Sequence, residues 1–304
     1  MSAKVKRVGG GRLTVLIPYL WLAAFFLVPF VIVVKISLSQ TAMALPPYTP
    51  VLDVLAGWDG VKQFAAQLSL DSYRLLGSDE LYLNSYLKSL EVAGVSTALL
   101  MLIGYPLAYG IARCPRGLQP LLVMLVVLPF WTSFLIRVYA WINILQRDGL
   151  LNDVLMRLHL IDAPVAWLAS DTAIYIGVVY SYLPFMVLPL YASLEKIDPS
   201  LIEAAADLGC PRWKSFWRVT FPLSWPGLAA GALLCFIPIT GEFVIPDLLG
   251  GSRSLMIGQT LWTEFFSNRD WPAASAIAVA LLALLLIPIL VYERLQKCAI
   301  GEAP

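Results

Sequence analysis

Residues 203–222 read EAAADLGCPRWKSFWRVTFP and form a polar stretch between two long apolar segments, residues 172–194 and 219–241. The start of this stretch has the marks of a short separate helix. Asp198 can cap it, Pro199 suits its first position, and Gly209 can end it. We therefore expect a small helix that stands outside the apolar segments.

One face of this short helix is small and apolar. Leu201, Ala204, Ala205 and Leu208 are spaced i, i+3, i+4 and i+7, so they share a face that Glu203 and Asp207 border. A shallow apolar ridge edged by carboxylates suits a groove on another protein. The pattern equally fits a loop helix that lies on lipid headgroups.

The whole stretch resembles the EAA loop of ABC-importer permeases, which reads Glu-Ala-Ala, three residues, Gly, nine residues, and then Ile-x-Leu-Pro. Here the matching positions are residues 203–205, Gly209 and residues 219–222, with Val in place of Ile and Phe in place of Leu. In that family the loop is a coupling helix that sits in a cleft of the ATPase subunit. The resemblance assigns this role to Glu203, Ala204, Ala205, Asp207 and Gly209.

The composition is that of a membrane protein, since 59% of the 304 residues are apolar and only 13% are charged. Six uncharged stretches of 20 or more residues occur, at 13–34, 92–112, 117–136, 172–194, 219–241 and 271–292. About 20 apolar residues cross a bilayer as a helix, and proline is tolerated in such helices. The sequence predicts an all-α integral membrane protein with six transmembrane helices.

The apolar stretches divide the chain into five parts. They are a basic cytoplasmic tail (1–12), a first transmembrane helix (13–38), a periplasmic segment (39–86), a five-helix core (87–293) that carries the coupling loop (195–222), and a cytoplasmic tail (294–304). The first apolar run is too long for a signal-peptide core and no cleavage site follows it, so we expect a retained anchor.

Basic residues predict the orientation. With the N-terminus in the cytoplasm, twelve of the 21 Lys and Arg fall in short cytoplasmic clusters beside helix ends, as the positive-inside rule expects. Both termini and residues 195–222 then face the cytoplasm. The net formal charge is about +6 inside and about −5 outside. An acidic external side attracts cations, although the bias also follows simply from keeping basic residues inside.

Motifs for chemistry within the chain are missing from the sequence. It has no G-x-x-x-x-G-K-[ST] loop for nucleotide phosphates, no nucleophile–base pair, and no Cys or His spacing typical of a metal site or disulfide. We therefore expect a non-catalytic subunit that binds no cofactor or metal, and the resemblance implies that ATP and Mg²⁺ are held by partner subunits.

Two apolar stretches end in residues that could contact a cation. In residues 128–141, LPFWTSFLIRVYAW, the helical spacing predicts that Trp131, Phe134 and Trp141 share a face, with Arg137 near its edge and Tyr139 further round. Aromatic faces attract organic ammonium ions. An aromatic belt at the membrane interface is the competing interpretation.

Residues 239–251, ITGEFVIPDLLGG, predict a helix that breaks near Glu242, because Pro238 and Gly241 weaken it there. A carboxylate at a broken helix is costly unless it faces water, a partner or a ligand. A structural salt bridge to Arg253 or Arg137 is the alternative. The candidate pathway residues are Trp131, Tyr139, Trp141, Glu242, Asp247, Trp262 and Glu264.

These stretches, together with YLPFMVLPLY (182–191) and NRDWP (268–272), resemble the permease subunit of putrescine/spermidine importers, and the likeness runs from about residue 17 to 292. The resemblance implies the type I ABC importer permease fold and a multi-pass location in the bacterial inner membrane. It also implies a heterodimer with a second homologous permease, two ATP-binding cassette subunits and a periplasmic polyamine-binding protein. Membrane lipid surrounds such a complex, and nucleic acid has no part in it.

Three other functions are compatible with parts of this sequence. An oxyanion ABC permease would share the coupling loop but should present Arg and backbone donors rather than acids. An ATP-independent secondary transporter would not need the loop, and a membrane scaffold would need neither the broken helix nor its acids. Carboxylates and aromatic rings on the external half of the protein favour polyamines, whose ammonium groups need the carboxylates and whose methylenes need the aromatic walls.

Overall fold

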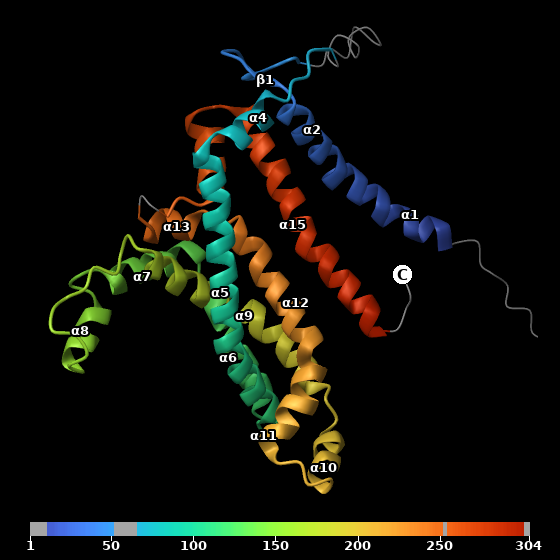
Figure 1. Cartoon of the computed structure of the whole chain (residues 1–304), viewed down its shortest axis with the longest axis vertical. Coiled ribbons are helices and arrows are strands. Elements are labelled where there is room, and N and C mark those ends of the chain that lie inside the picture. Colours follow the sequence, from blue (N-terminus) through green and yellow to red (C-terminus); the bar gives the residue numbers. More distant parts are fainter. Residues whose placement is uncertain (1–10, 52–65, 252–253, 301–304) are drawn as a thin grey trace, which may run out of the picture. The chain divides into compact units, whose positions relative to one another are not determined.

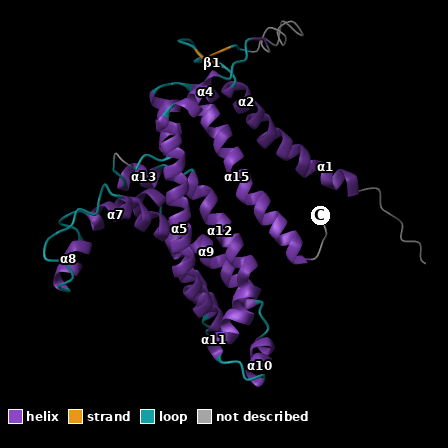
Figure 2. Ribbon diagram, viewed as in Figure 1, coloured by secondary structure: helices purple, strands orange, loops and turns teal. Residues whose placement is uncertain are grey.

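The structure is a computed structural model, and it describes residues 11–51, 66–251 and 254–300. These residues are mostly helical (Figure 2). The chain forms two compact units, which are Met1–Asp79 with Thr263–Leu282 and Glu80–Trp262 with Ala283–Pro304. Parts of both predicted tails (1–10 and 301–304) and of the predicted periplasmic segment (52–65) lie outside the described residues.

The first unit joins the first apolar helix to a small region of strands and turns. Its elements are α1 (Gly11–Leu22), a π-helical turn (Ala23–Leu27), α2 (Val28–Ser37), β1 (Gln40–Thr41), β2 (Tyr48–Thr49), α4 (Asp71–Ser78), a π-helical turn (Thr263–Ser267) and the beginning of α15 (Trp271–Ile300). The two strands pair antiparallel, Gln40 opposite Thr49.

Asp270 of the NRDWP motif ties this unit together. Its Oδ1 accepts hydrogen bonds from the Ala273 amide (3.0 Å) in the first turn of α15 and from the Thr41 hydroxyl (2.8 Å) beside the strands. The Trp271 ring packs on Phe265 at 5.2 Å between ring centroids. The motif therefore caps α15 and fixes the strand region to it.

The second unit contains most of the helices. Its elements are α5 (Glu80–Arg113), α6 (Gln119–Val127), a 3₁₀ turn (Leu128–Trp131), α7 (Phe134–Leu145), α8 (Leu150–Arg157), α9 (Asp171–Glu195), α10 (Pro199–Asp207), α11 (Arg212–Ser215), a π-helical turn (Phe216–Thr220), α12 (Phe221–Thr240), α13 (Val244–Leu249), α14 (Ile257–Trp262) and the rest of α15. Helices α5, α9 and α12 pack side by side, and α10 follows at one end (Figure 1).

The described residues contain five helices long and apolar enough to cross a membrane, or up to six spans if one bent pair counts as a span, where the sequence predicts six. Among the described residues, the five helices are Leu16–Ser37, Glu80–Arg113, Asp171–Glu195, Arg212–Thr240 and Trp271–Arg294. The bent pair is Gln119–Trp131 and Phe134–Leu145, which is bent by 89°. Many large apolar side chains are exposed, such as Ile17 at 67% and Leu102 at 71%, which suits a lipid environment.

The bend overturns the prediction that Trp131, Phe134 and Trp141 share one helical face. The 3₁₀ turn contains Pro129, and the chain is extended at Thr132 (ψ 152°) and Ser133 (ψ 136°) before α7 begins. Proline lacks an N–H and disfavours a continued helix, so the helical spacing stops there. Trp131 therefore lies before the bend, while the other two rings belong to α7.

Two helices begin earlier than the apolar pattern indicates. Helix α5 starts at Glu80, within the predicted periplasmic segment. The helical path into α12 starts at Arg212, so the second half of the predicted loop 195–222 is helix rather than connection. Both extensions carry polar residues, which hydropathy assigns to loops but which a helix accommodates equally well.

The centre of the second unit is the packing of α5, α9 and α12. Leu100, Met186 and Ile239, one from each helix, have no exposed surface. Small residues allow the close approach, because a Cβ on Gly227 of α12 would stand 2.8 Å from the Pro189 carbonyl oxygen of α9. Small residues at helix contacts are typical of membrane bundles.

Candidate functional site

Helix α10 has the ends that the sequence predicts. The Asp198 carboxylate accepts a hydrogen bond from the Ser200 amide (2.9 Å), Pro199 occupies the first position, and the helix ends at Asp207. Gly209 follows with φ +75°, a left-handed conformation that favours glycine. The hydrogen bond from the Ser200 amide lowers the pKa of the Asp198 carboxyl group below its usual value.

The ridge on α10 is open. Leu208 is 89% exposed and Leu201 46% exposed, and Ala204 is also exposed, while Ala205 is partly buried. The carboxylates at its edges, Glu203 and Asp207, are exposed as well. An apolar ridge that the chain itself leaves uncovered fits the groove-docking interpretation of this helix.

A cluster of aromatic rings follows α10 and joins it to the bundle. Phe216 lies at its centre, with ring centroids 5.6 Å from Tyr105, 5.5 Å from Tyr109 and 5.3 Å from Trp217. The Tyr105 and Ser224 hydroxyls are 2.8 Å apart and share a hydrogen bond between α5 and α12. Edge-to-face ring contacts of this kind stabilise a fixed arrangement. The turn after α10 is thus held to two helices of the core.

Glu242 stands where α12 ends. The helix stops at Thr240, and the Glu242 carboxylate accepts from the Val244 amide (3.0 Å) and, more weakly, the Ile245 amide (3.5 Å) at the start of α13. Its second oxygen accepts a hydrogen bond from the Tyr182 hydroxyl of α9 at 2.6 Å. The predicted broken helix and its acid are therefore present, and the acid also caps the helix that follows.

Aromatic and polar groups lie around this acid. The ring of Phe243, the next residue, stacks on Trp262 of α14 with 4.8 Å between centroids and 10° between planes. The Gln259 amide group is 3.5 Å from the exposed carboxylate of Asp247 in α13. The structure thus brings Glu242, Asp247 and Trp262 into one region of consecutive short helices.

The remaining candidate pathway residues are Trp131, Tyr139, Trp141 and Glu264. Trp131 is 76% exposed, Tyr139 is 54% exposed, and Trp141 packs edge-on against Tyr180 of α9 with 5.4 Å between centroids. Glu264 belongs to the other compact unit, where its carboxylate accepts a hydrogen bond from the Asn268 side chain at 2.9 Å. Trp141 therefore packs on α9, the helix that also carries Tyr182, whereas Glu264 lies in the other compact unit.

The alternative of a salt bridge at Glu242 finds no support among the described residues. The ion pairs seen there, which include Arg74–Asp71, Lys88–Glu91 and Lys88–Asp171, do not involve Glu242. Arg137 instead lies over the rings of Phe130 and Phe134. Arg253, the other suggested partner, lies outside the described residues.

The sequence matches the family of binding-protein-dependent transport system inner membrane components over residues 12–298. The chain belongs to this family. The permease is 38% identical over 286 residues to the spermidine/putrescine transport system permease protein PotB of Haemophilus influenzae, and the match covers 94% of each chain. It is 42% identical over 230 residues to PotB of Escherichia coli, covering 75% of this chain and 83% of that protein.

A solved structure shares the fold of the permease. A chain from a bacterial ABC transporter involved in the import of the acidic polysaccharide alginate superposes with a TM-score of 0.69. The two chains are 17% identical, and 94% of each is covered. The type I ABC importer permease fold predicted from the sequence is confirmed, as is the resemblance to polyamine permeases.

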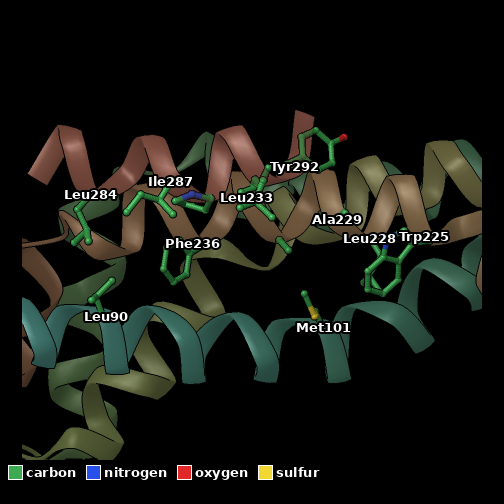
Figure 3. Close-up of a pocket in the computed structure, with 13 residues that line it drawn as sticks. Leu90, Met101, Trp225, Leu228, Ala229, Leu233, Phe236, Leu284, Ile287 and Tyr292 are labelled. Atoms are coloured by element: carbon green, nitrogen blue, oxygen red, sulfur yellow. The ribbon is translucent and has the colours of Figure 1, made fainter. Parts of the chain in front are cut away.

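A cavity of about 460 Å³ in the permease lies between α5, α12 and the last part of α15. Figure 3 shows the side chains that line it, among them Leu90, Met101, Leu233, Phe236 and Ile287. Its lining contains no Asp or Glu. A carboxylate-free apolar cavity does not suit an ammonium ligand, so the acid-bearing region at Glu242 is the better candidate.

Two contacts near the candidate residues were not predictable from the sequence. Tyr182 holds Glu242 although 60 positions separate them, and a tyrosine in an apolar run reads as an interface residue. Phe216 and Trp217 lie in the polar stretch 203–222, and no spacing rule there indicates their contacts with Tyr105 and Tyr109. The signal in both cases is a contact between helices distant in sequence, which periodicity does not reveal.

Proposed function

We propose that this chain is one permease subunit of an ATP-driven importer of polyamines, putrescine or spermidine or both, in the bacterial inner membrane. It forms half of the translocation pathway and works with a second homologous permease, two ATP-binding cassette subunits that hold ATP and Mg²⁺, and a periplasmic polyamine-binding protein. The similarity to the two PotB proteins over most of the chain is the observation that carries the proposal.

Helix α10 supplies the coupling step. Its exposed ridge of Leu201, Ala204 and Leu208 docks in a cleft of an ATPase subunit, with Glu203 and Asp207 at the rim. Movement of the ATPase then reaches α5 and α12 through the ring cluster around Phe216, because those rings contact both helices. A rigid connection is needed here, since a flexible loop would absorb the movement.

Glu242 supplies a passing contact for the substrate. Its carboxylate replaces water around one ammonium group, and the stacked rings of Phe243 and Trp262 offer an aromatic wall for the methylenes. Three donors already occupy much of the acceptor capacity of the carboxylate. The site is therefore weak, which suits a pathway that must release its substrate.

The deciding experiment is uptake of labelled putrescine and spermidine into proteoliposomes that carry all the subunits. We expect uptake that requires ATP and the binding protein, and that excess unlabelled polyamine abolishes. Molybdate or sulfate should neither compete nor be taken up. Uptake of an oxyanion, or polyamine uptake that continues without ATP, would favour the oxyanion permease or the secondary transporter instead.

A further inference from the structure

Arg137 of α7 is a buried cation without a counter-charge among the described residues. Arg137 is only 9% exposed. Its Nε and Nη1 atoms have no hydrogen-bond partner in the described part of the chain. The guanidinium carbon lies 5.1 Å from the ring centroid of Phe130 and 5.7 Å from that of Phe134. Rings attract a cation but do not cancel its charge, so its field extends into the surroundings.

A row of aromatic rings connects this cation with the acid at the broken helix. Phe130 packs edge-on against Phe185 of α9 with 5.1 Å between centroids. Phe185 lies 5.9 Å from Tyr182, whose hydroxyl donates to Glu242. Arg137 and Glu242 thus lie at the two ends of one aromatic row, and an ammonium group that passes Glu242 feels both charges.

We propose that Arg137 is a specificity-determining residue whose uncompensated positive charge opposes the passage of polyamines according to their number of ammonium groups. The proposal rests on the polyamine transport proposed above. Glu242 attracts the passing ammonium, while Arg137 repels every ammonium within range. At an effective dielectric of about 20 and separations on the order of 12 to 25 Å, this repulsion slows passage roughly three- to tenfold for each additional ammonium. A triamine is therefore held back more than a diamine.

The test measures the ratio of maximal uptake rates for spermidine and putrescine by the complete complex in proteoliposomes, at saturating binding protein. Because the binding protein stays the same, a changed ratio reports on the permease. Arg137→Gln should raise the spermidine-to-putrescine ratio about three- to tenfold per assembled complex. Arg137→Lys keeps the charge and should leave the ratio near that of the wild type. A merely structural arginine would lower both rates together and leave the ratio alone.

A second pair of variants neutralises the charge without removing the arginine. Ser133 is exposed, occupies the N-cap of α7 and stands four residues before Arg137. Ser133→Asp keeps a good cap and adds a carboxylate at i, i+4 spacing, whereas Ser133→Asn caps without charge. Of these two variants, we expect Ser133→Asp to raise the spermidine-to-putrescine ratio and Ser133→Asn to leave it unchanged. The pair tests the role of Arg137 even if Arg137→Gln does not assemble. An unchanged ratio in Ser133→Asp overturns the role of Arg137, while absence of polyamine uptake by the wild-type complex overturns the proposed function instead.

Discussion

Substitution of Glu242 can separate its hydrogen bond to the start of α13 from the pathway role that we propose for its charge. The carboxylate caps α13 through the Val244 amide, and we propose that it also stands in for water around an ammonium group. Glu242→Gln retains a carbonyl oxygen for the cap and removes the charge. At an effective dielectric near 20, an ion pair about 4 Å apart gains roughly 4 kcal/mol, of which desolvation removes much. We expect uptake per assembled complex to fall about tenfold, with Glu242→Asp milder.

The control for this prediction is the amount of assembled complex, measured in the same membranes. A structural salt bridge predicts the opposite pattern, in which Glu242→Gln lowers assembly and a charge reversal at Arg253 or Arg137 restores it. Arg137 lies over the rings of Phe130 and Phe134 instead, and Arg253 lies outside the described residues, so this experiment decides between the two interpretations. Normal uptake per complex in Glu242→Gln would end the pathway interpretation.

Substitution of Gly209 tests the coupling loop without a clash between the new Cβ and neighbouring atoms. The φ of +75° at this glycine penalises any side chain, yet a Cβ there would meet no atom within 4 Å. Gly209→Val should therefore cost roughly 1 kcal/mol in backbone strain alone. We expect several-fold weaker coupling between ATP hydrolysis and uptake, with membrane assembly preserved, as measured by substrate-stimulated ATPase activity and uptake together.

Two matched variants accompany Gly209→Val. Gly117 also has open space around its Cβ position but lacks the positive φ, so Gly117→Val should be close to neutral. Gly209→Asn should be milder than valine, because asparagine tolerates the left-handed region. Full stimulated ATPase activity and full uptake in Gly209→Val would contradict the role of this loop as the docking element.

Single residues were predictable where a local rule applies. Helix α10 begins after Asp198 with Pro199 and ends just before Gly209, as the capping rules predict. Glu242 lies just beyond the end of α12, which Pro238 and Gly241 weaken. Tyr182 and Arg137 were not predictable in their observed contacts, since each depends on a neighbour from a different helix or from across a bend.

Among the helices, the bend between α6 and α7 shows where periodicity fails. The uncharged run across residues 117–136 reads as one helix, because apolar side chains satisfy a membrane helix and a broken pair equally. Pro129 is the local residue that indicates a break in the helix. Proline alone does not predict a break, because Pro184 lies inside the unbroken helix α9. Which proline ends a helix depends on neighbouring helices that satisfy the freed backbone groups.

The ring cluster after α10 predicts a coupling defect that leaves the ATPase itself intact. Phe216→Ala removes the ring that contacts Tyr105, Tyr109 and Trp217 together. Loss of a partly buried phenylalanine costs about 2–4 kcal/mol of local packing. We expect basal ATP hydrolysis to remain and polyamine uptake to fall several-fold, measured on the same reconstituted complex.

The matched variant is Trp225→Ala. Trp225 touches the cluster only at its edge, 6.1 Å from Phe221, and is half exposed. It should reduce uptake much less than Phe216→Ala. Equal effects of the two substitutions would mean that the cluster does not transmit movement.

For the whole chain, composition and uncharged runs were sufficient to predict the fold class and five of the apolar segments as continuous helices, while the sixth is a bent pair. Long apolar runs predict helices whose apolar side chains face lipid, and the exposed side chains of Trp21 and Ile287 fit that prediction. The division into two compact units was not predictable, because the boundary between Leu282 and Ala283 falls inside the single apolar run that forms α15. Contacts that cross the chain, such as the hydrogen bond from Thr41 to Asp270, decide it.

Orientation is the remaining prediction for the whole molecule, and three cysteines can test it. Cys114 and Cys210 are partly exposed, whereas Cys235 is buried within the packing of α9 and α12 and serves as an internal negative control. With residues 195–222 in the cytoplasm, a membrane-impermeant thiol reagent should label Cys114 and Cys210 in inside-out vesicles and not in intact spheroplasts. The basic clusters beside these positions motivate the expectation, since such clusters stay in the cytoplasm. Single-cysteine variants that keep Cys114 or Cys210 give the cleanest readout, scored by the mass of the labelled chain. Labelling of Cys210 from the periplasmic side would reverse the orientation, and it would also remove α10 from the side of the membrane where an ATPase could bind it.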